Sequence, residues 1–151
     1  MRTEDLRALA TELADEPPGR LAVTITLPTR PDGLDRGESL RMRHLADRAA
    51  EALPRLGLAR DVAERLRTRL GALPEELERM PPPRGRGAAA YVTADRTRLL
   101  RLARTPIERV LLGDTFPLAV PIAEVLAADD LDVLVLSIGG GGTDGARHYR
   151  L

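Results

Sequence analysis

The stretch from residue 81 to 87, Pro-Pro-Pro-Arg-Gly-Arg-Gly, divides the chain into two parts with different hydrophobic patterns. Consecutive prolines cannot extend a helix, and the glycines after them free the backbone from the restriction that a Cβ imposes. Before this stretch, apolar residues recur mostly at helical spacing, and after it they follow the pattern of strands. The sequence therefore predicts a linker here, stiff and then flexible.

The first part predicts helices around a single strand. Leu6, Leu9, Ala10 and Leu13 recur at i, i+3, i+4 and i+7, which predicts a short amphipathic helix. The segment 21–27 is rich in β-branched residues and predicts a strand that Pro28 ends. After an exposed loop at 29–37, two helices are predicted at 38–53 and 61–73. A further turn follows at 74–80, with proline at its first position.

The second part predicts mainly strands. Segments 88–93 and 98–103 flank a four-residue loop and form a hairpin, and 109–112 is a further short strand. A helix at 118–128, a strand at 130–138 and an edge strand at 146–150 complete the order. This order predicts an α/β (α+β) fold, with a mixed four- to five-stranded sheet packed between helices and one domain over residues 1–151. The expected core comprises Leu6, Val23, Ile25, Leu45, Leu66, Leu70, Val92, Leu100, Val110, Leu112, Leu126, Val133 and Val135.

Composition argues against an enzyme and against a bound cofactor. There is no cysteine and there are only two histidines, so neither a structural metal site nor thiolate chemistry is expected. Neither serine lies in a nucleophile-elbow motif, so no catalytic residue is assigned. Gly140, Gly142 and Gly145 match the spacing of a dinucleotide-binding loop, but too little sequence follows for the helix that would hold a pyrophosphate. A hairpin loop is the expected structure there.

The charged residues are balanced in number but unusual in kind. The chain has 23 cationic and 23 acidic residues, and every cation is arginine. The planar guanidinium suits bidentate contact with phosphate better than an ammonium does. Because only three residues are aromatic, base stacking on an aromatic surface is not expected. Any nucleic acid would therefore be held mainly through its phosphates.

One group of basic side chains forms the candidate binding site. Arg41, His44 and Arg48 recur at i, i+3 and i+7 in the helix predicted at 38–53. The same cluster includes two loop arginines and one more from the helix, namely Arg30, Arg36 and Arg43. The functional interpretation is contact with an RNA backbone. The alternative is a solvated face with intrahelical salt bridges, because acidic residues at 47 and 51 alternate with the arginines.

Several segments, in order, resemble a known family. They are Thr105–Phe116 with the helix and strand that follow, Val23–Arg30, Leu40–Leu45, and Ala90–Val92 with Arg98–Leu102. Together they resemble the N-terminal domain of archaeo-eukaryotic class I release factors. They are most similar to the bacterial archaeo-eukaryotic release factor family. The resemblance covers most of the chain and implies the fold of that domain and action at the ribosome.

Departures from the family pattern argue against its activity. Release factors read stop codons with a Tyr-x-Cys-x-x-x-Phe pattern, where this chain has Val110, Leu112 and Phe116. These residues and Asp114 form the equivalent of the decoding loop. The second decoding motif, Asn-Ile-Lys-Ser, is impossible in a chain without asparagine or lysine, and the Gly-Gly-Gln motif of peptide release belongs to a later domain. Stop-codon reading and peptide release are therefore not expected.

The expected function is that of a non-catalytic, translation-associated factor that binds the ribosome or a structured RNA in stasis, rescue or regulation. The alternative is a protein-interaction module that docks a partner chain, or a second copy, through the edge strand at 146–150. No apolar stretch reaches the roughly 18 residues of a membrane span, and the first residues lack the apolar core of a signal peptide. A cytoplasmic protein without membrane contact is therefore expected.

Overall fold

The computed structural model describes residues 3–15, 20–30, 37–81, 85–128, 132–136 and 146–150. Its elements are, in order, α1 (Thr3–Ala14), β1 (Ala22–Pro28), α2 (Glu38–Ala52), the short 3₁₀ helix η1 (Leu53–Leu56), α3 (Arg60–Arg79), β2 (Gly87–Val92), β3 (Thr97–Leu102), β4 (Arg109–Gly113), α4 (Ala119–Ala128), β5 (Asp132–Leu136) and β6 (Ala146–Arg150).

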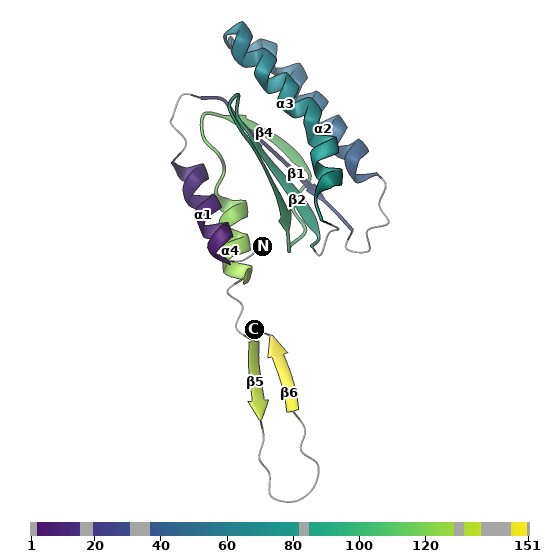
Figure 1. Cartoon of the computed structure of the whole chain (residues 1–151), viewed down its shortest axis with the longest axis vertical. Helices are drawn as coiled ribbons and strands as arrows, with labels where there is room; N and C mark the ends of the chain where they lie inside the picture. The colour runs from purple at the N-terminus through teal and green to yellow at the C-terminus, as the bar shows by residue number, and fades with distance from the viewer. Residues whose placement is uncertain are drawn as a thin grey trace, which may run out of the picture.

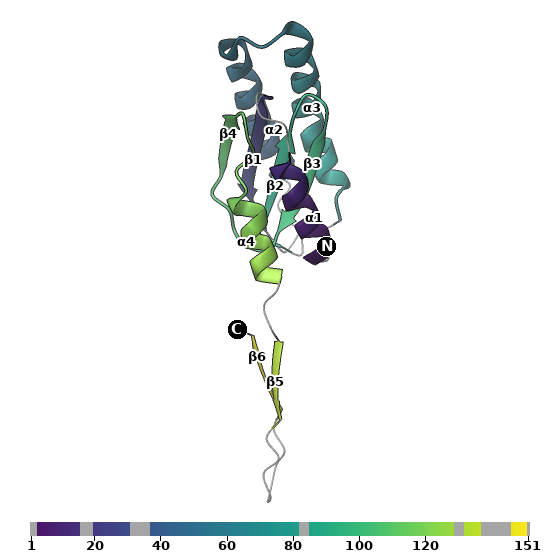
Figure 2. The ribbon, with the colours of Figure 1, turned by 90° about the vertical axis from the view of Figure 1, so that its left-hand side faces the viewer.

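A four-stranded sheet forms the middle layer, with strand order β3-β2-β1-β4. Helices α2 and α3 cover one face, and α1 and α4 lie side by side on the other (Figures 1 and 2). The predicted α+β class, with a sheet between helices, is confirmed. All three strand pairings are antiparallel, so the four-stranded sheet does not mix directions as expected. The reason is that β2, β3 and β4 alternate in direction through short connections, while the helices α2 and α3 between β1 and β2 return the chain to the end of the sheet where β1 stops.

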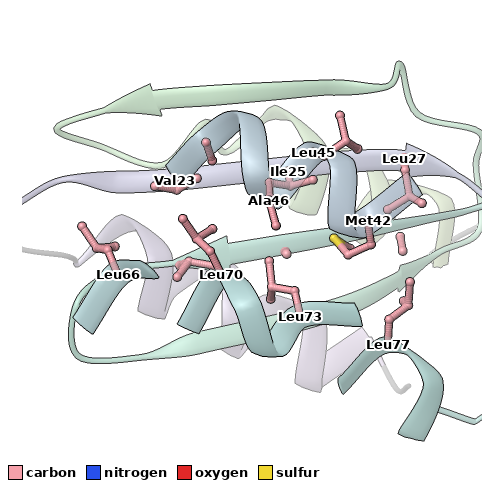
Figure 3. Packing of buried hydrophobic residues seen from close by; sticks show 14 of the residues in the cluster. Val23, Ile25, Leu27, Met42, Leu45, Ala46, Leu66, Leu70, Leu73 and Leu77 are labelled. Atoms are coloured by element: carbon pink, nitrogen blue, oxygen red, sulfur yellow. The ribbon is translucent and has the colours of Figure 1, made fainter. Parts of the chain in front are cut away.

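The larger core lies between the sheet and the α2–α3 pair (Figure 3). Val23, Ile25 and Leu27 point to this face because alternate residues of a strand share a face. They meet Leu45 of α2 and Leu70 of α3, both almost fully buried. Other expected core residues in this cluster are Leu66 and Val92, while Val110 and Leu112 are partly buried against it. This aliphatic layer fixes how α2 sits on the sheet.

A smaller core lies on the other face, under α1 and α4. Leu13 of α1, Leu100 of β3 and Phe116 are buried there. The ring of Tyr91 meets that of Phe116 edge to face, with ring centroids 5.5 Å apart and an interplanar angle of 87°. This geometry is favoured because the positive edge of one ring meets the negative face of the other.

Helix α3 corrects one sequence prediction. It runs unbroken from Arg60 to Arg79 with Pro74 inside, where a helix and a separate turn were predicted. Proline removes one backbone hydrogen bond and normally kinks or ends a helix. The buried stripe of Leu66, Leu70, Leu73 and Leu77 stays in phase across the proline. Packing of this stripe on the sheet outweighs the lost hydrogen bond.

The predicted linker is also corrected at residues 85–87. Gly85 and Gly87 are buried, and Gly87 already belongs to β2. A Cβ at position 85 would lie 2.0 Å from the Leu102 carbonyl oxygen, and one at 87 would lie 2.1 Å from Cδ of Pro106. The glycines therefore allow close packing against the chain that leaves β3, where flexibility had been predicted.

Strands β5 and β6 form their own antiparallel pair, apart from the four-stranded sheet and beyond the end of α4 (Figures 1 and 2). The strand predictions are confirmed for the backbone of residues 132–136 and 146–150, and the other residues of the predicted strand at 130–138 lie outside the described residues. Four expected core side chains, Leu6, Leu126, Val133 and Val135, lie outside the side chains that the structure describes. No helix in the described part of the chain is long and apolar enough to cross a membrane.

Candidate nucleic-acid interface

Packing of α2 on the sheet decides which of its side chains face outward. Met42, Leu45 and Ala49 are buried against the sheet. With about 3.6 residues per turn, the opposite side of the helix carries the exposed residues. These are Leu40 and five polar residues, Arg43, His44, Asp47, Arg48 and Glu51; the five polar residues we call the outer α2 face. Three of the predicted site residues, Arg43, His44 and Arg48, thus lie on one exposed surface.

The arginines of the outer α2 face form no ion pair with Asp47 or Glu51, the two carboxylates of the same face, among the described residues. Asp47 lies four residues after Arg43, at the spacing of a helical ion pair. Nevertheless, within the described residues the side chains of Arg43, His44 and Arg48 make neither a salt bridge nor a hydrogen bond. The interpretation of this surface as a network of intrahelical salt bridges therefore has no support from the side-chain geometry.

Helix α3 provides the contrast. Arg60 Nε lies 3.0 Å from Glu64 Oε1, and Arg79 Nη2 lies 3.0 Å from Glu75 Oε2. Arg65 bridges Asp61 of its own helix and Asp95 of the β2–β3 turn, at 3.2 Å each. Arginine content alone therefore does not distinguish α2 from α3. The difference is that Arg60, Arg65 and Arg79 of α3 already have an anionic partner, whereas Arg43 and Arg48 of α2, like Arg67 of α3, have none among the described residues.

Arg41 and Arg30 differ from the outer α2 face in their surroundings. Arg41 is half-buried, and its Nη2 donates to the Pro28 carbonyl oxygen at 3.1 Å. It therefore ties the start of α2 to the end of β1. Arg30 is exposed, and its backbone N–H donates to Oε1 of Glu38 at 3.2 Å. The predicted cluster is thus spread over the outer α2 face and the end of β1, and Arg36 lies outside the described residues.

A buried ion pair supports this corner of the molecule. Arg101 Nη1 of β3 lies 3.1 Å from Oε2 of Glu38, and these side chains are only 18% and 10% exposed. Arg101 Nη2 also donates to the Leu77 carbonyl oxygen of α3 at 3.4 Å. Glu38 therefore connects β3, the start of α2 and Arg30. Sequence reasoning missed this pair, although strand alternation puts Arg101 on the same side as Leu99, and a charge on a covered face requires a partner.

The predicted decoding-loop residues do not converge on one surface. Val110 and Leu112 pack toward the α2–α3 layer, whereas Phe116 is buried on the opposite face of the sheet. Asp114 is exposed, in the turn after β4. Phe116 is therefore a core anchor for Tyr91 rather than an exposed ring. These four residues form no common pocket wall.

Polar groups under α4 are internal contacts. Glu124 is 6% exposed, and its two carboxylate oxygens accept the backbone N–H groups of Ala103 at 2.6 Å and Arg104 at 3.3 Å. Burial raises the pKa of the Tyr91 hydroxyl, and the negative charge of Glu124 adds to this, partly opposed by Arg109. The phenol is therefore neutral over the ordinary pH range, and these groups fasten α4 to the sheet.

No protein-family model matches the sequence, and no curated protein shows significant sequence similarity to it. The resemblance to release factors therefore rests on the order and spacing of the motifs alone.

Proposed function

We propose that the chain is a non-catalytic, RNA-directed factor that acts at the ribosome in the cytoplasm, in stasis, rescue or regulation of translation. The observation that carries the proposal is the outer α2 face, where Arg43 and Arg48 are exposed and, within the described residues, have no carboxylate partner. Unpaired guanidinium groups gain electrostatic stabilisation when they bind a polyanion. The paired arginines of α3 already have this stabilisation from carboxylates within the protein.

Phosphate contact is the chemistry that suits this surface. A guanidinium donates two parallel hydrogen bonds to phosphate oxygens, and each neutralised phosphate releases condensed counterions. Such contacts position a protein on a nucleic acid without reading its sequence. His44 lies between the two arginines in sequence and adds a further hydrogen-bonding group to the same exposed side of α2.

The ribosome as the place of action is supported by the family resemblance. Its motifs include β1 with the arginine after it, the start of α2 and the β2–β3 hairpin. The absence of codon reading is supported by Val110 and Leu112, whose aliphatic side chains cannot form the hydrogen bonds that discriminate bases. On this proposal the factor binds RNA by its backbone and leaves peptide release to other proteins.

Co-sedimentation with small ribosomal subunits across a KCl series tests the proposal. The variant Arg43→Gln with Arg48→Gln removes two unpaired charges, and the control Arg60→Gln with Arg65→Gln removes two paired ones from α3. We expect the bound fraction to fall with salt for the wild type, to fall strongly for the α2 variant and to change little for the control. The proposal is contradicted if the wild type does not bind at low salt, or if the bound fraction falls equally in the α2 variant and in the α3 control.

Protein docking is the second candidate function, and one observation favours it. In the described part of the sheet, β4 pairs only with β1, and its residues 109–113 are all partly exposed. Ile107, just before this strand, is 75% exposed. An open edge strand offers its backbone to a peptide from a partner. Association with ribosomes that resists salt and is indifferent to the α2 variant favours this function over RNA binding.

A further inference from the structure

The end of the sheet where β1 stops and β2 starts carries an arginine held in an unusual backbone position. Arg86 is exposed between two buried glycines. Its N–H donates to the Leu102 carbonyl oxygen at 2.8 Å, although the register pairs Leu102 with Gly87. The chain therefore departs from the regular ladder just before β2 begins, because the carbonyl that the register places opposite Gly87 accepts the N–H of the preceding residue. This hydrogen bond holds the backbone of Arg86 at the sheet end while its side chain is exposed.

Arg86 is fixed from both sides. Its carbonyl oxygen accepts the N–H of Thr29 at 2.9 Å, so the residue connects the chain after β1 with the end of β3. The close approach of Gly85 to Leu102 and of Gly87 to Pro106 leaves no room for side chains at the two flanking positions. The sequence Gly-Arg-Gly thus places one long cationic side chain on a tightly packed turn.

Two further arginines lie at the ends of the neighbouring strands. Arg104 follows β3, and its N–H donates to Oε1 of Glu124 at 3.3 Å. Arg30 follows β1, and its N–H donates to Oε1 of Glu38 at 3.2 Å. Both side chains are exposed, as is that of Arg86. We call Arg30, Arg86 and Arg104 the sheet-end arginines.

Their guanidinium groups have no anionic partner in the part of the chain that the structure describes. The two carboxylates that approach these residues are already used by other groups. Glu124 accepts two backbone N–H groups, and Glu38 accepts a backbone N–H and pairs with Arg101. The sheet-end arginines are therefore held by their backbones, while their charges are free to meet an external anion.

We infer that the sheet-end arginines bind the phosphate backbone of a single RNA strand. The inference rests on the proposed function for the class of ligand and adds a second contact surface at the end of the sheet. Because β1, β2 and β3 are neighbours and adjacent strands lie about 4.8 Å apart, the three backbones span roughly 10 Å. Flexible arginine side chains on this base reach neighbouring phosphates of one strand.

An RNA backbone fits this surface better than a protein does. Protein interfaces centre on apolar side chains and are depleted of charge in the middle. Here the centre is Arg86 on glycine backbone, with exposed arginines after the strands to either side. These arginines contact phosphates and not bases, so the surface is expected to bind RNA of any nucleotide sequence.

Fluorescence anisotropy with a short, labelled oligouridylate in a KCl series tests the inference. The triple variant Arg30→Gln, Arg86→Gln, Arg104→Gln removes three phosphate contacts. We expect the slope of log K against log[salt] to become shallower by about 2, because each contact with a single strand contributes about 0.7. The matched control Arg60→Gln, Arg65→Gln, Arg79→Gln removes the same charge from ion-paired positions of α3 and should leave the slope unchanged. Circular dichroism melts confirm that both variants are folded.

The outcomes separate this inference from the proposed function. If the triple variant keeps the wild-type slope, or the control loses as much, the inference is overturned. It is equally overturned if the chain binds polyglutamate through these arginines and does not bind the oligouridylate, since the ligand is then an acidic protein. If the salt slope becomes shallower as expected but the protein does not co-sediment with ribosomal subunits, RNA binding by the sheet-end arginines is supported and the ribosomal function is contradicted.

Discussion

The two helical layers of this domain cover the same sheet but use their charged side chains differently. The α2–α3 layer has a long aliphatic core, and its outer α2 face exposes arginines without carboxylate partners among the described residues. The α1–α4 layer has a smaller core and uses polar groups in contacts with the sheet. There, Glu12 pairs with Arg96 at 2.6 Å and with Arg98 at 2.9 Å, and Glu124 holds backbone N–H groups. Both layers are attached to the sheet by charged groups, as the Glu38–Arg101 pair shows for α2. The layer with the larger apolar core also exposes two arginines, Arg43 and Arg48, that no such contact among the described residues uses.

The largest expected effect comes from removing apolar volume from each layer. Leu70→Ala truncates a side chain that is 1% exposed between α3 and the sheet, and Leu13→Ala truncates the side chain by which α1 packs into the smaller core. Leucine-to-alanine changes in a core cost about 2–5 kcal/mol. We expect Leu70→Ala near the top of this range and Leu13→Ala near the bottom, because α1 can shift to fill the space. Urea unfolding measures both, and equal losses contradict the difference between the layers.

A smaller effect is expected from the polar attachment of α4. Glu124→Ala removes a carboxylate that is 6% exposed and leaves the part-buried N–H groups of Ala103 and Arg104 without this acceptor. Because residues 103 and 104 are exposed, we expect a cost toward the lower end of the about 1–3 kcal/mol of an unsatisfied buried group. The exposed Glu75, which pairs only with Arg79 in the described residues, is the control, and Glu75→Ala should change the free energy of unfolding by less than about 1 kcal/mol. If the two changes destabilise alike, Glu124 is not what fastens α4.

The smallest effect concerns the Tyr91 hydroxyl, which is buried without a hydrogen-bond partner in the described chain. Its pKa is raised in the folded state, so above the unfolded value of about 10 the unfolded chain loses this proton first. The free energy of unfolding is therefore unaffected by this group below about pH 10. Above that pH it falls by about 1.4 kcal/mol per pH unit, because the unfolded chain is deprotonated while the folded chain still holds the phenol neutral. Tyr91→Phe should be nearly neutral at pH 7 and should remove this alkaline loss. Unfolding curves of both proteins at several pH values measure the difference.

Local patterns predicted most of the fold. The helices, the hairpin and the short strand β4 follow from apolar period and turn residues, which act over a few neighbouring positions. Pro74 misled the prediction of α3 because local chemistry favours a break there, while the buried leucine stripe that keeps the helix intact depends on a sheet distant in sequence. The glycines at 85 and 87 were interpreted as flexible for the same reason, since the chain that packs against them is not adjacent in sequence.

The candidate site was predictable only in part. Helical spacing correctly grouped His44 and Arg48 on one face, but it included Arg41, which turns to the Pro28 carbonyl. Whether an arginine forms an ion pair depends on residues distant in sequence, such as Asp95 for Arg65 and Glu38 for Arg101. The sheet-end arginines are separated in sequence and come together only because β1, β2 and β3 are neighbours.

The most direct test of the central claim compares individual guanidinium groups in one sample. Nitrogen-detected NMR of arginine Nε–Hε groups, titrated with ribosomal RNA fragments, reports which side chains gain a partner. We expect the signals of Arg43 and Arg48 to shift and become protected from exchange, while those of Arg60, Arg65 and Arg79 stay unchanged. Shifts confined to α3, or the same small shift at every arginine, contradict the claim that unpaired charges on α2 make the RNA contact.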